Sequence, residues 1–492
     1  MSRFIRPFFW FLVVVTFFSL LSHFLIPIIN YGQIGKETFV AEMIRSFING
    51  ETVGFLFPIR HFLEPHHTDL IPWAEEFPIF HLIIAGIHKL LALISIDANP
   101  IILSKTLNIG AFATLIAGFF SIGKTLFPKG DSNTPWIFAV SAVLFPAFQL
   151  YSIEVMPDLW MLALCVWAIQ KTLAEKHFNA AVLIGLAALF KYYAAFTAFG
   201  IGLYHLYRWI KTKSSKEFLN AFTIALSIIP CVAFIIYFIK AGIPNPITEY
   251  RASDGHGHLS STHGVLEIKK WGRVGLWLFV KNSTIFGSLL AGFGLYQIRK
   301  SIHPLFITLM IGWFLFPLTF IESFIVHDYY GLQASIGTTI FMAIGLIELS
   351  KKGKIFFPSA IAVLTIWGLF SVQGMTKPIT DFERIVEDYP KLLQKFPSPP
   401  KRAFVISGIS KPVIPHLLKL DSWIASYAEA DQDTINKILK NSTVEMVMIH
   451  GFTSQDPETD QIKLKLESTG LLEVAEDRQY ETTRLIVLKR KS

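Results

Sequence analysis

Charged residues and cysteines are both scarce in this chain. Only 16% of its 492 residues are Asp, Glu, Lys or Arg, against about 25% in an ordinary globular domain. The hydrophobic fraction is 52%, which excludes a disordered chain and a simple cytosolic enzyme. The two cysteines, Cys165 and Cys231, exclude a disulfide scaffold, and both lie in apolar runs, so they say little about the redox compartment.

The few charges are unevenly distributed along the chain. Residues 380–492 hold 16 Lys and Arg and 17 Asp and Glu, a net charge of −1. Residues 1–379 hold the remaining 28 and 19, a net charge of +9. A long charge-poor segment therefore precedes a short charge-rich one. We predict a polytopic membrane domain over 1–376 and a soluble extracytoplasmic domain over 377–492.

Twelve apolar segments have roughly the length of a membrane span, for which about 20 residues are needed. Arg3 and Arg6 precede the first, which is too long for a signal-peptide core and predicts an uncleaved helix with a cytoplasmic N-terminus. The segments run approximately over 8–29, 77–95, 101–122, 135–151, 157–174, 178–190, 192–209, 218–241, 276–296, 303–323, 329–349 and 354–374.

The positive-inside rule orders these segments across the membrane. Clusters of Lys and Arg predict cytoplasmic connections at 124–129, 171–176, 208–216, 299–300 and 351–354. Every segment from 101 to 374 then alternates, whereas 77–95 would begin and end outside. We interpret 77–95 as a re-entrant or interfacial helix, or as a miscount. The fold class is mainly α, with about 11 to 13 transmembrane helices and eleven true crossings as the best count.

The C-terminal segment predicts a small α/β domain, entered through the Pro-rich stretch 396–402. Residues 403–408 and 444–450 are typical of buried strands, and 433–441 and 459–469 have helical apolar spacing. Residues 471–477 and 482–489 predict a hairpin that closes the sheet. This domain carries no phosphate-binding glycine loop and no metal-spaced cluster, so we interpret it as a structural or acceptor-contacting appendage.

The loop 30–76 lies on the predicted outer face and carries several carboxylates. From Glu37 onward, apolar residues recur at helical spacing and predict an amphipathic helix in the membrane interface. Glu37 is either a plain helix-start residue or a catalytic acid. Glu75 and Glu76 end the loop, directly before the segment that does not fit the topology.

Two further charges lie at the outer ends of predicted spans. Asp158 follows Pro157 at a helix start, so it is either a helix cap or a functional carboxylate. Lys191 is the only charged residue between His177 and His205. It either snorkels to the interface or binds an anionic ligand at the outer surface.

The loop 242–275 and the turn 327–330 complete the outer polar set. His256, His258 and His263 have no diagnostic metal-ligand spacing, and the glycines between them favour a mobile loop, with Arg251 available for a phosphate. The sequence His-Asp-Tyr-Tyr at 327–330 is either a helix cap with interfacial tyrosines or part of a site. We predict no metal site, although a divalent metal is left open as a cofactor.

These residues suit a reaction in which a lipid phosphate leaves and an acceptor loses a proton. Basic groups would offset the charge that develops on the phosphate, and a carboxylate would act as the general base. In order along the chain, the set resembles the GT-C polyprenyl-phosphate-sugar-dependent glycosyltransferases, the group of the protein O-mannosyltransferases and the lipid A aminoarabinose transferases. The resemblance rests on Glu37 with Ala41, Glu75-Glu76 with Pro78, Pro157-Asp158, the Lys191 turn and the 327–330 turn.

The resemblance implies sugar transfer from a polyprenyl-phosphate donor, with inversion, on the periplasmic face of a bacterial inner membrane. The acceptor would be a lipid, a protein or a glycan, and no nucleic acid is expected as a partner. It implies Glu37, Glu76 or Asp158 as the catalytic acid or base. Groups that bind the lipid phosphate or the substrate would be Lys36, Lys191, Arg251, His327 and Tyr330.

This chain departs from the family pattern at two points. Lys36 stands where the family usually has Asp before Glu, and the chain has Glu75-Glu76-Phe77-Pro78 where the family often has Glu-Lys-Pro-Pro, so a cation is lost. The catalytic base is therefore open among three acids, and Lys36 is a candidate for the lost cation. A lipid or glycan transporter and a non-catalytic family member remain alternatives, although no internal repeat of the kind that transporters show is evident.

Overall fold

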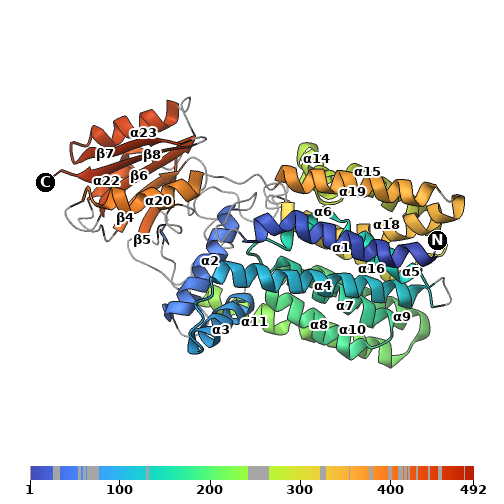
Figure 1. Ribbon diagram of the computed structural model, residues 1–492. Helices are drawn as coiled ribbons and strands as arrows, with labels where there is room; N and C mark the ends of the chain where they lie inside the picture. Colours follow the sequence, from blue (N-terminus) through green and yellow to red (C-terminus); the bar gives the residue numbers. More distant parts are fainter. Residues whose placement is uncertain are drawn as a thin grey trace. The chain divides into compact units, whose positions relative to one another are not determined.

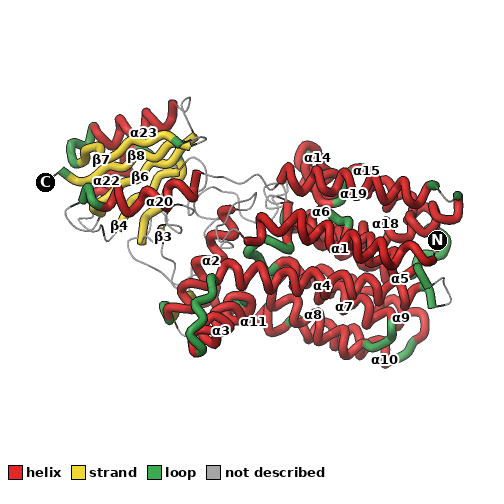
Figure 2. Tube along the Cα trace, viewed as in Figure 1, coloured by secondary structure: helices red, strands yellow, loops and turns green. Residues whose placement is uncertain are grey.

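The structure is a computed structural model of the whole chain (Figure 1). It describes residues 2–25, 34–53, 57–58, 62–63, 77–128, 132–241, 265–321, 328–353, 355–375, 381–396, 400, 402–407, 414, 418, 421–427, 430–440, 444–452, 457–480 and 483–491. Most of the described chain is helical, and all described strands except β1 (Thr52–Val53) and β2 (Phe57–Pro58) belong to one six-stranded sheet (Figure 2). The predicted fold class, mainly α with a small C-terminal α/β domain, is confirmed.

Contacts divide the chain into two compact units. The first contains Met1–Ile26, Ala74–Ile87 and Ile96–Thr376. The second contains Pro27–Trp73, His88–Ser95 and Lys377–Ser492. Short segments from the first hundred residues therefore fold with the C-terminal domain.

The first unit is built from helices. Helix α15 packs against α18, α7 packs against both α4 and α8, and α9 packs against α10 and α16. The helices are α1 (Ser2–Leu25), α4 (Pro100–Leu126), α5 (Thr134–Val143), α6 (Pro146–Tyr151), α7 (Asp158–Leu173), α8 (His177–Phe190), η1 (Tyr192–Ala194), α9 (Ala195–Thr212), α10 (Ser215–Ser227), α11 (Ile229–Lys240), α14 (Ile268–Leu276), η2 (Trp277–Asn282), α15 (Ile285–Ile298), α16 (Pro304–Thr319), η3 (Asp328–Gly331), α18 (Leu332–Lys352) and α19 (Phe356–Met375).

Within the described residues, three helical segments are long and apolar enough to cross a membrane alone: Pro100–Leu126 (α4), Ser215–Lys240 (α10 followed by α11) and Leu332–Lys352 (α18). Several further apolar helices have 10–17 residues, and many of their large side chains are exposed, as lipid contact requires. The chain is a membrane protein. The count of eleven crossings stays a prediction.

Two predicted spans are not single helices. The segment predicted at 276–296 bends by 97° between Ile268–Asn282 and Ile285–Ile298, because Thr284 takes a φ of 64° and starts α15 with its own side chain as the cap. The segment predicted at 135–151 is broken between α5 and α6, since Pro146 lacks the N–H that a continuous helix would use.

The segment 77–95, which did not fit the topology, forms α3 (Ile79–Leu93). Its 15 residues span about 22 Å, less than the roughly 30 Å hydrocarbon layer. One face is buried, including His81, while Leu90 and Leu93 are exposed. This length agrees with the re-entrant or interfacial interpretation.

The second unit contains α2 (Ile34–Asn49) and a six-stranded sheet. The predicted helix after residue 36 is confirmed, and its residues Val40, Met43, Ile44 and Phe47 are buried. A two-stranded ribbon, β1 (Thr52–Val53) with β2 (Phe57–Pro58), follows it.

The strand order of the sheet is β3-β5-β4-β6-β8-β7. The first four strands are parallel to one another, and β8 pairs antiparallel with both of its neighbours, β6 and β7. Apolar clusters fill both faces, one with α22 and α23 and the other with α20. The elements are β3 (Phe62–Leu63), α20 (Asp381–Leu393), β4 (Arg402–Ser407), β5 (Asp421–Ser426), α22 (Gln432–Leu439), β6 (Val444–Phe452), α23 (Pro457–Glu467), β7 (Leu472–Gln479) and β8 (Thr483–Arg490).

The predicted strands, helices and closing hairpin of this domain are confirmed to within a few residues. The sequence analysis missed β5 and α20. Helix α20 has one apolar face, with Ile385 and Leu392 buried on the sheet, but its charged residues and Pro390 obscured it.

Ion pairs fasten α20 to the edge of this sheet. Arg478 of β7 pairs with Asp388 of α20, and Lys395 pairs with Glu476. The hydrogen bond from Arg478 holds the pKa of Asp388 below its usual value, and that from Lys395 does the same for Glu476. Because both carboxyl pKa values are lowered in the folded state, the stabilisation is present above pH about 4 and is lost as the pH falls further.

We expect Arg478→Met to lower the unfolding temperature of the second unit at pH 7 and to have little effect at pH 3. At pH 3 the partner carboxylates are largely protonated in the unfolded chain, so the ion pair contributes less. The matched control is Lys489→Met, whose pair with Glu473 is more exposed and should matter little at either pH. Hydrogen exchange of the β7 amides reports on the effect, and an equal loss at both pH values would contradict it.

Candidate functional site

Asp158 and Lys191, two residues predicted from the sequence, form a buried ion pair. Lys191 Nζ lies 3.9 Å from Asp158 Oδ2, and the two side chains are 3% and 0% exposed. A buried charge is costly unless it is paired or serves a function, so the pair is the first candidate for a site.

The helices explain why these residues meet. Asp158 is the first residue of α7, and Lys191 ends α8, which packs against α7 as the other arm of a helical hairpin. A carboxylate in the first turn also complements the helix dipole. Lys191 itself is extended, with φ −152° and ψ 123°, and its N–H bonds to Ala187 O.

Tyr330, a predicted substrate-binding residue, packs against the segment that follows Lys191. Its ring is buried and meets Tyr193, two residues after Lys191, edge-on at 5.7 Å. Phe316 stacks on Tyr193 at 5.3 Å. The segment after Lys191 is therefore anchored in an aromatic cluster formed by η1, α16 and η3.

Three buried polar residues on α4 and in the segment before Asp158 were not predicted from the sequence. Asn108 of α4 donates to Glu154 O at 2.6 Å and to Met156 O at 2.8 Å. Glu154 is 0% exposed, and Lys105, one turn before Asn108, is 1% exposed. Lys105 lies inside a predicted span, and a charge within such a span was the signal that could have found it.

The other predicted residues are not brought to this pair by the described structure. Lys36 and Glu37 lie in the first turn of α2, in the second unit, and their side chains are outside the described part. Glu76, Arg251 and His327 also lie outside the described residues. In α2, the sequence analysis missed Glu42, which is buried and pairs with Arg45 at 3.2 Å.

A second polar network lies at the other end of the α7–α8 hairpin. Arg208 bonds to Glu217 at 2.9 Å and to Glu175 at 3.3 Å, and His205 Nδ1 lies 2.8 Å from Glu217. It joins α9 and α10 to the α7–α8 turn. Glu175 and Arg208 belong to the connections 171–176 and 208–216, which are predicted to be cytoplasmic, and His205 and Glu217 lie close to the second of them in the sequence.

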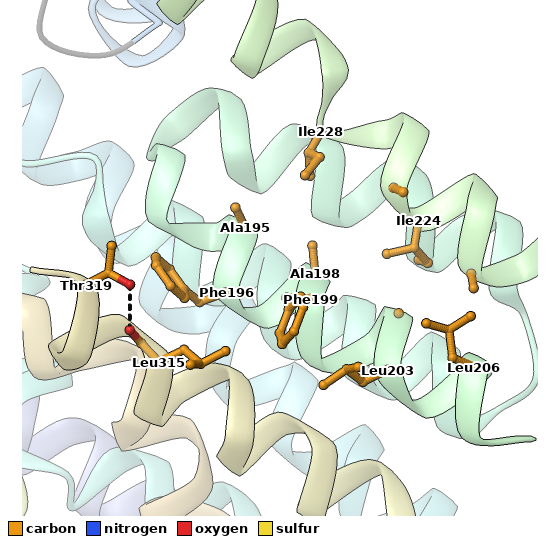
Figure 3. A pocket seen from close by; sticks show the side chains of 13 residues that line it. Ala195, Phe196, Ala198, Phe199, Leu203, Leu206, Ile224, Ile228, Leu315 and Thr319 are labelled. Carbon is orange, nitrogen blue, oxygen red and sulfur yellow. Dashed lines mark hydrogen bonds between the residues drawn. The ribbon is translucent and has the colours of Figure 1, made fainter.

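An apolar groove follows α9 (Figure 3). It encloses about 470 Å³ between α9, α10 and α16, and its walls include Phe196, Phe199, Leu203 and Ile224. Thr319 is polar, but its hydroxyl donates to Leu315 O at 2.8 Å, so it presents little polarity to the groove. The lining starts at Ala195, four residues after Lys191.

Within the described ranges, no three His, Cys, Asp or Glu residues are grouped as a metal site would require. His256, His258 and His263 lie outside those ranges.

No family model and no curated protein matches the sequence. Solved structures do match. ArnT from Cupriavidus metallidurans bound to undecaprenyl phosphate aligns with a TM-score of 0.58 and 11% identity, over 96% of this chain and 97% of that one. The Archaeoglobus fulgidus oligosaccharyltransferase in complex with Zn and sulfate aligns with a TM-score of 0.56 and 12% identity, over 89% of this chain and 67% of that one.

The chain has the GT-C fold. The fold that the resemblance implied is therefore confirmed. At 11–12% identity the likeness concerns the fold, so activity must be argued from the site.

Proposed function

We propose that this protein is a membrane glycosyltransferase that takes a sugar from a polyprenyl-phosphate-linked donor. The observation that carries the proposal is the buried Asp158–Lys191 pair, in a helical unit that also holds an apolar groove whose lining begins four residues after Lys191. A lipid-linked sugar has a matching chemistry, with an anionic phosphate joined to a long apolar chain. One solved structure of the same fold holds undecaprenyl phosphate, and another, from Archaeoglobus fulgidus, holds a dolichol-phosphate.

The groove suits the isoprenoid chain of the donor. Its lining runs along α9 from Ala195 to Leu206, about 16 Å of helix. Aromatic and aliphatic side chains line it, so an isoprenoid would exchange lipid contacts for protein contacts at little cost.

Lys191 is the candidate for the phosphate. Its ammonium would offset the negative charge that grows on the leaving phosphate as the bond from the sugar carbon to the phosphate oxygen breaks. A fixed cation in a buried site needs little reorganisation during the reaction, which makes it effective there.

The acceptor must lose a proton as its oxygen or nitrogen attacks the sugar carbon. A carboxylate takes that proton, and attack on the face opposite the phosphate inverts the anomeric centre. Asp158 is the described candidate for this base, and Glu37 and Glu76 are the two others on the predicted outer side.

We place this chemistry on the extracytoplasmic face of a bacterial inner membrane, because the basic connections orient the helices that way. The acceptor is a lipid, a protein or a glycan. The second unit would lie on the same side.

Purified protein supplied with a radiolabelled polyprenyl-phosphate sugar and an envelope extract should release polyprenyl phosphate and label an acceptor covalently. We expect Lys191→Ala to slow this transfer on the order of 100-fold, the size of effect seen when a charge-stabilising donor is removed. Lys171→Ala, which removes a cation from the other end of α7, is the matched control and should change the rate little. Movement of the lipid across vesicles without a labelled product would instead support a transporter.

A further inference from the structure

Two buried amide side chains hold the backbone on either side of the Asp158–Lys191 pair. Asn108 comes from α4 and Gln333 from α18, and they are 0% and 1% exposed. Neither belongs to the segments that carry the ion pair. A buried amide is costly unless its hydrogen bonds are made, so its partners indicate what it is there to hold.

Asn108 holds the turn that leads into Asp158. Its Nδ2 donates to two carbonyls, Glu154 O at 2.6 Å and Met156 O at 2.8 Å. Both carbonyls belong to the segment 152–157 between α6 and α7, and Asp158 is the next residue. Two bonds to alternate residues fix the course of this irregular segment, and with it the position of the first residue of α7.

Gln333 contacts the segments of both partners. Its Nε2 donates to Tyr193 O at 2.5 Å, two residues after Lys191. The same nitrogen lies 3.7 Å from Met161 Sδ, less than one helical turn after Asp158 on α7. A single side chain from α18 therefore contacts both η1, which directly follows Lys191, and the helix that begins with Asp158.

The distance between the two charged groups is longer than that of a direct hydrogen bond. A tight charge-assisted hydrogen bond between an ammonium and a carboxylate is about 2.7–2.9 Å long, whereas Lys191 Nζ and Asp158 Oδ2 are 3.9 Å apart. Were both backbones free to shift, the two charges would close on each other. A closed pair would leave less of the lysine's charge for a ligand.

We propose that Asn108 and Gln333 are positioning residues that hold Lys191 and Asp158 apart, and so make the site select a phosphate head group. The inference rests on the proposed function, in which Lys191 binds the lipid phosphate. The amides act through the backbone and need not touch the substrate. Their effect falls on head-group recognition, because the groove that holds the chain is lined by other residues.

The test compares two lipids with the same chain, undecaprenyl phosphate and undecaprenol, whose head group is a hydroxyl. Their affinities for the purified full-length protein are measured in detergent by calorimetry, and the ratio gives the head-group preference. We expect Asn108→Leu and Gln333→Met, which keep the size but remove the donor, to reduce this preference roughly 10-fold or more, as mutations of supporting hydrogen bonds do. The affinity for undecaprenol should stay unchanged.

Gln170→Met is the matched control. Gln170 is a buried amide near the end of α7, at the opposite end of the helix from Asp158. Its Nε2 donates to Thr125 Oγ1 at 3.2 Å. Its loss should lower stability but leave the preference intact, so a purely structural effect is recognised. If Asn108→Leu does not fold, Asn108→Ser keeps one small donor and should give an intermediate preference.

The phosphate site and the positioning role are overturned by different results. A wild-type protein without any preference for the phosphate would overturn the phosphate site, and the positioning role with it. A wild-type preference that persists in the folded Asn108→Leu and Gln333→Met proteins would overturn the positioning role alone.

Discussion

Replacing Asp158 by asparagine should reduce sugar transfer by roughly 100- to 10,000-fold, the range by which a general base accelerates a reaction. The substitution keeps the shape of the side chain, so α7 should still begin at this residue. It removes the carboxylate that we propose as the general base, together with the charge that faces Lys191 across 3.9 Å. The rate is measured with the labelled donor under saturating acceptor.

Asp97→Asn is the matched control, because Asp97 is an exposed carboxylate just before α4 in the same unit. Breaking a buried ion pair also destabilises a protein by about 3–5 kcal/mol, so rates are compared per folded molecule. Folded Asp158→Asn protein with the full wild-type rate would show that Asp158 is not the base. Glu37→Gln and Glu76→Gln would then decide between the other two acids.

Gly294→Ala should strongly destabilise the helical unit. Gly294 of α15 lies where α15 and α18 approach each other, and an added Cβ would clash with Phe341 O and lie 2.7 Å from Gly345 N. Both obstacles are backbone atoms, so relief requires α15 and α18 to separate. Overpacking of this kind costs typically 1–3 kcal/mol and sometimes more.

Gly292→Ala provides the comparison within the same helix. A Cβ at Gly292 would meet nothing within 4 Å, so alanine should be neutral or favour the helix by up to about 1 kcal/mol. The two variants differ by the same single methyl group, two residues apart. Thermal unfolding of the detergent-solubilised protein measures both, and equal midpoints would show that the close approach of α15 and α18 does not limit stability.

Much of the secondary structure was predictable because it follows from local patterns. The strands β4, β6 and β8 carry apolar runs, and α22 and α23 carry the expected helical spacing. The breaks at Pro146 and Thr284 were harder to predict. A hydropathy window gives the mean over many residues, so it does not register an effect of one residue. A missing N–H or a positive φ interrupts a helix at a single position.

The site was predictable only in part. Asp158 and Lys191 stood out because each is a charged residue at the end of an apolar segment. Asn108 and Gln333 did not stand out, because a neutral amide in an apolar segment has no pattern of its own. Their importance depends on carbonyls 46 and 140 residues away in the sequence.

By itself, the sequence determined a charge-poor membrane part, a charged C-terminal α/β domain and a short set of polar residues on one predicted side. Hydropathy and charge are properties of each segment alone, so they can be determined without knowing which segments pack against it. Only the tertiary structure decided which polar residues meet. It paired Lys191 with Asp158, formed an apolar groove whose lining begins four residues after Lys191, and bonded two amides from α4 and α18 to the backbone near the pair. Such contacts arise from helix packing between segments distant in the chain.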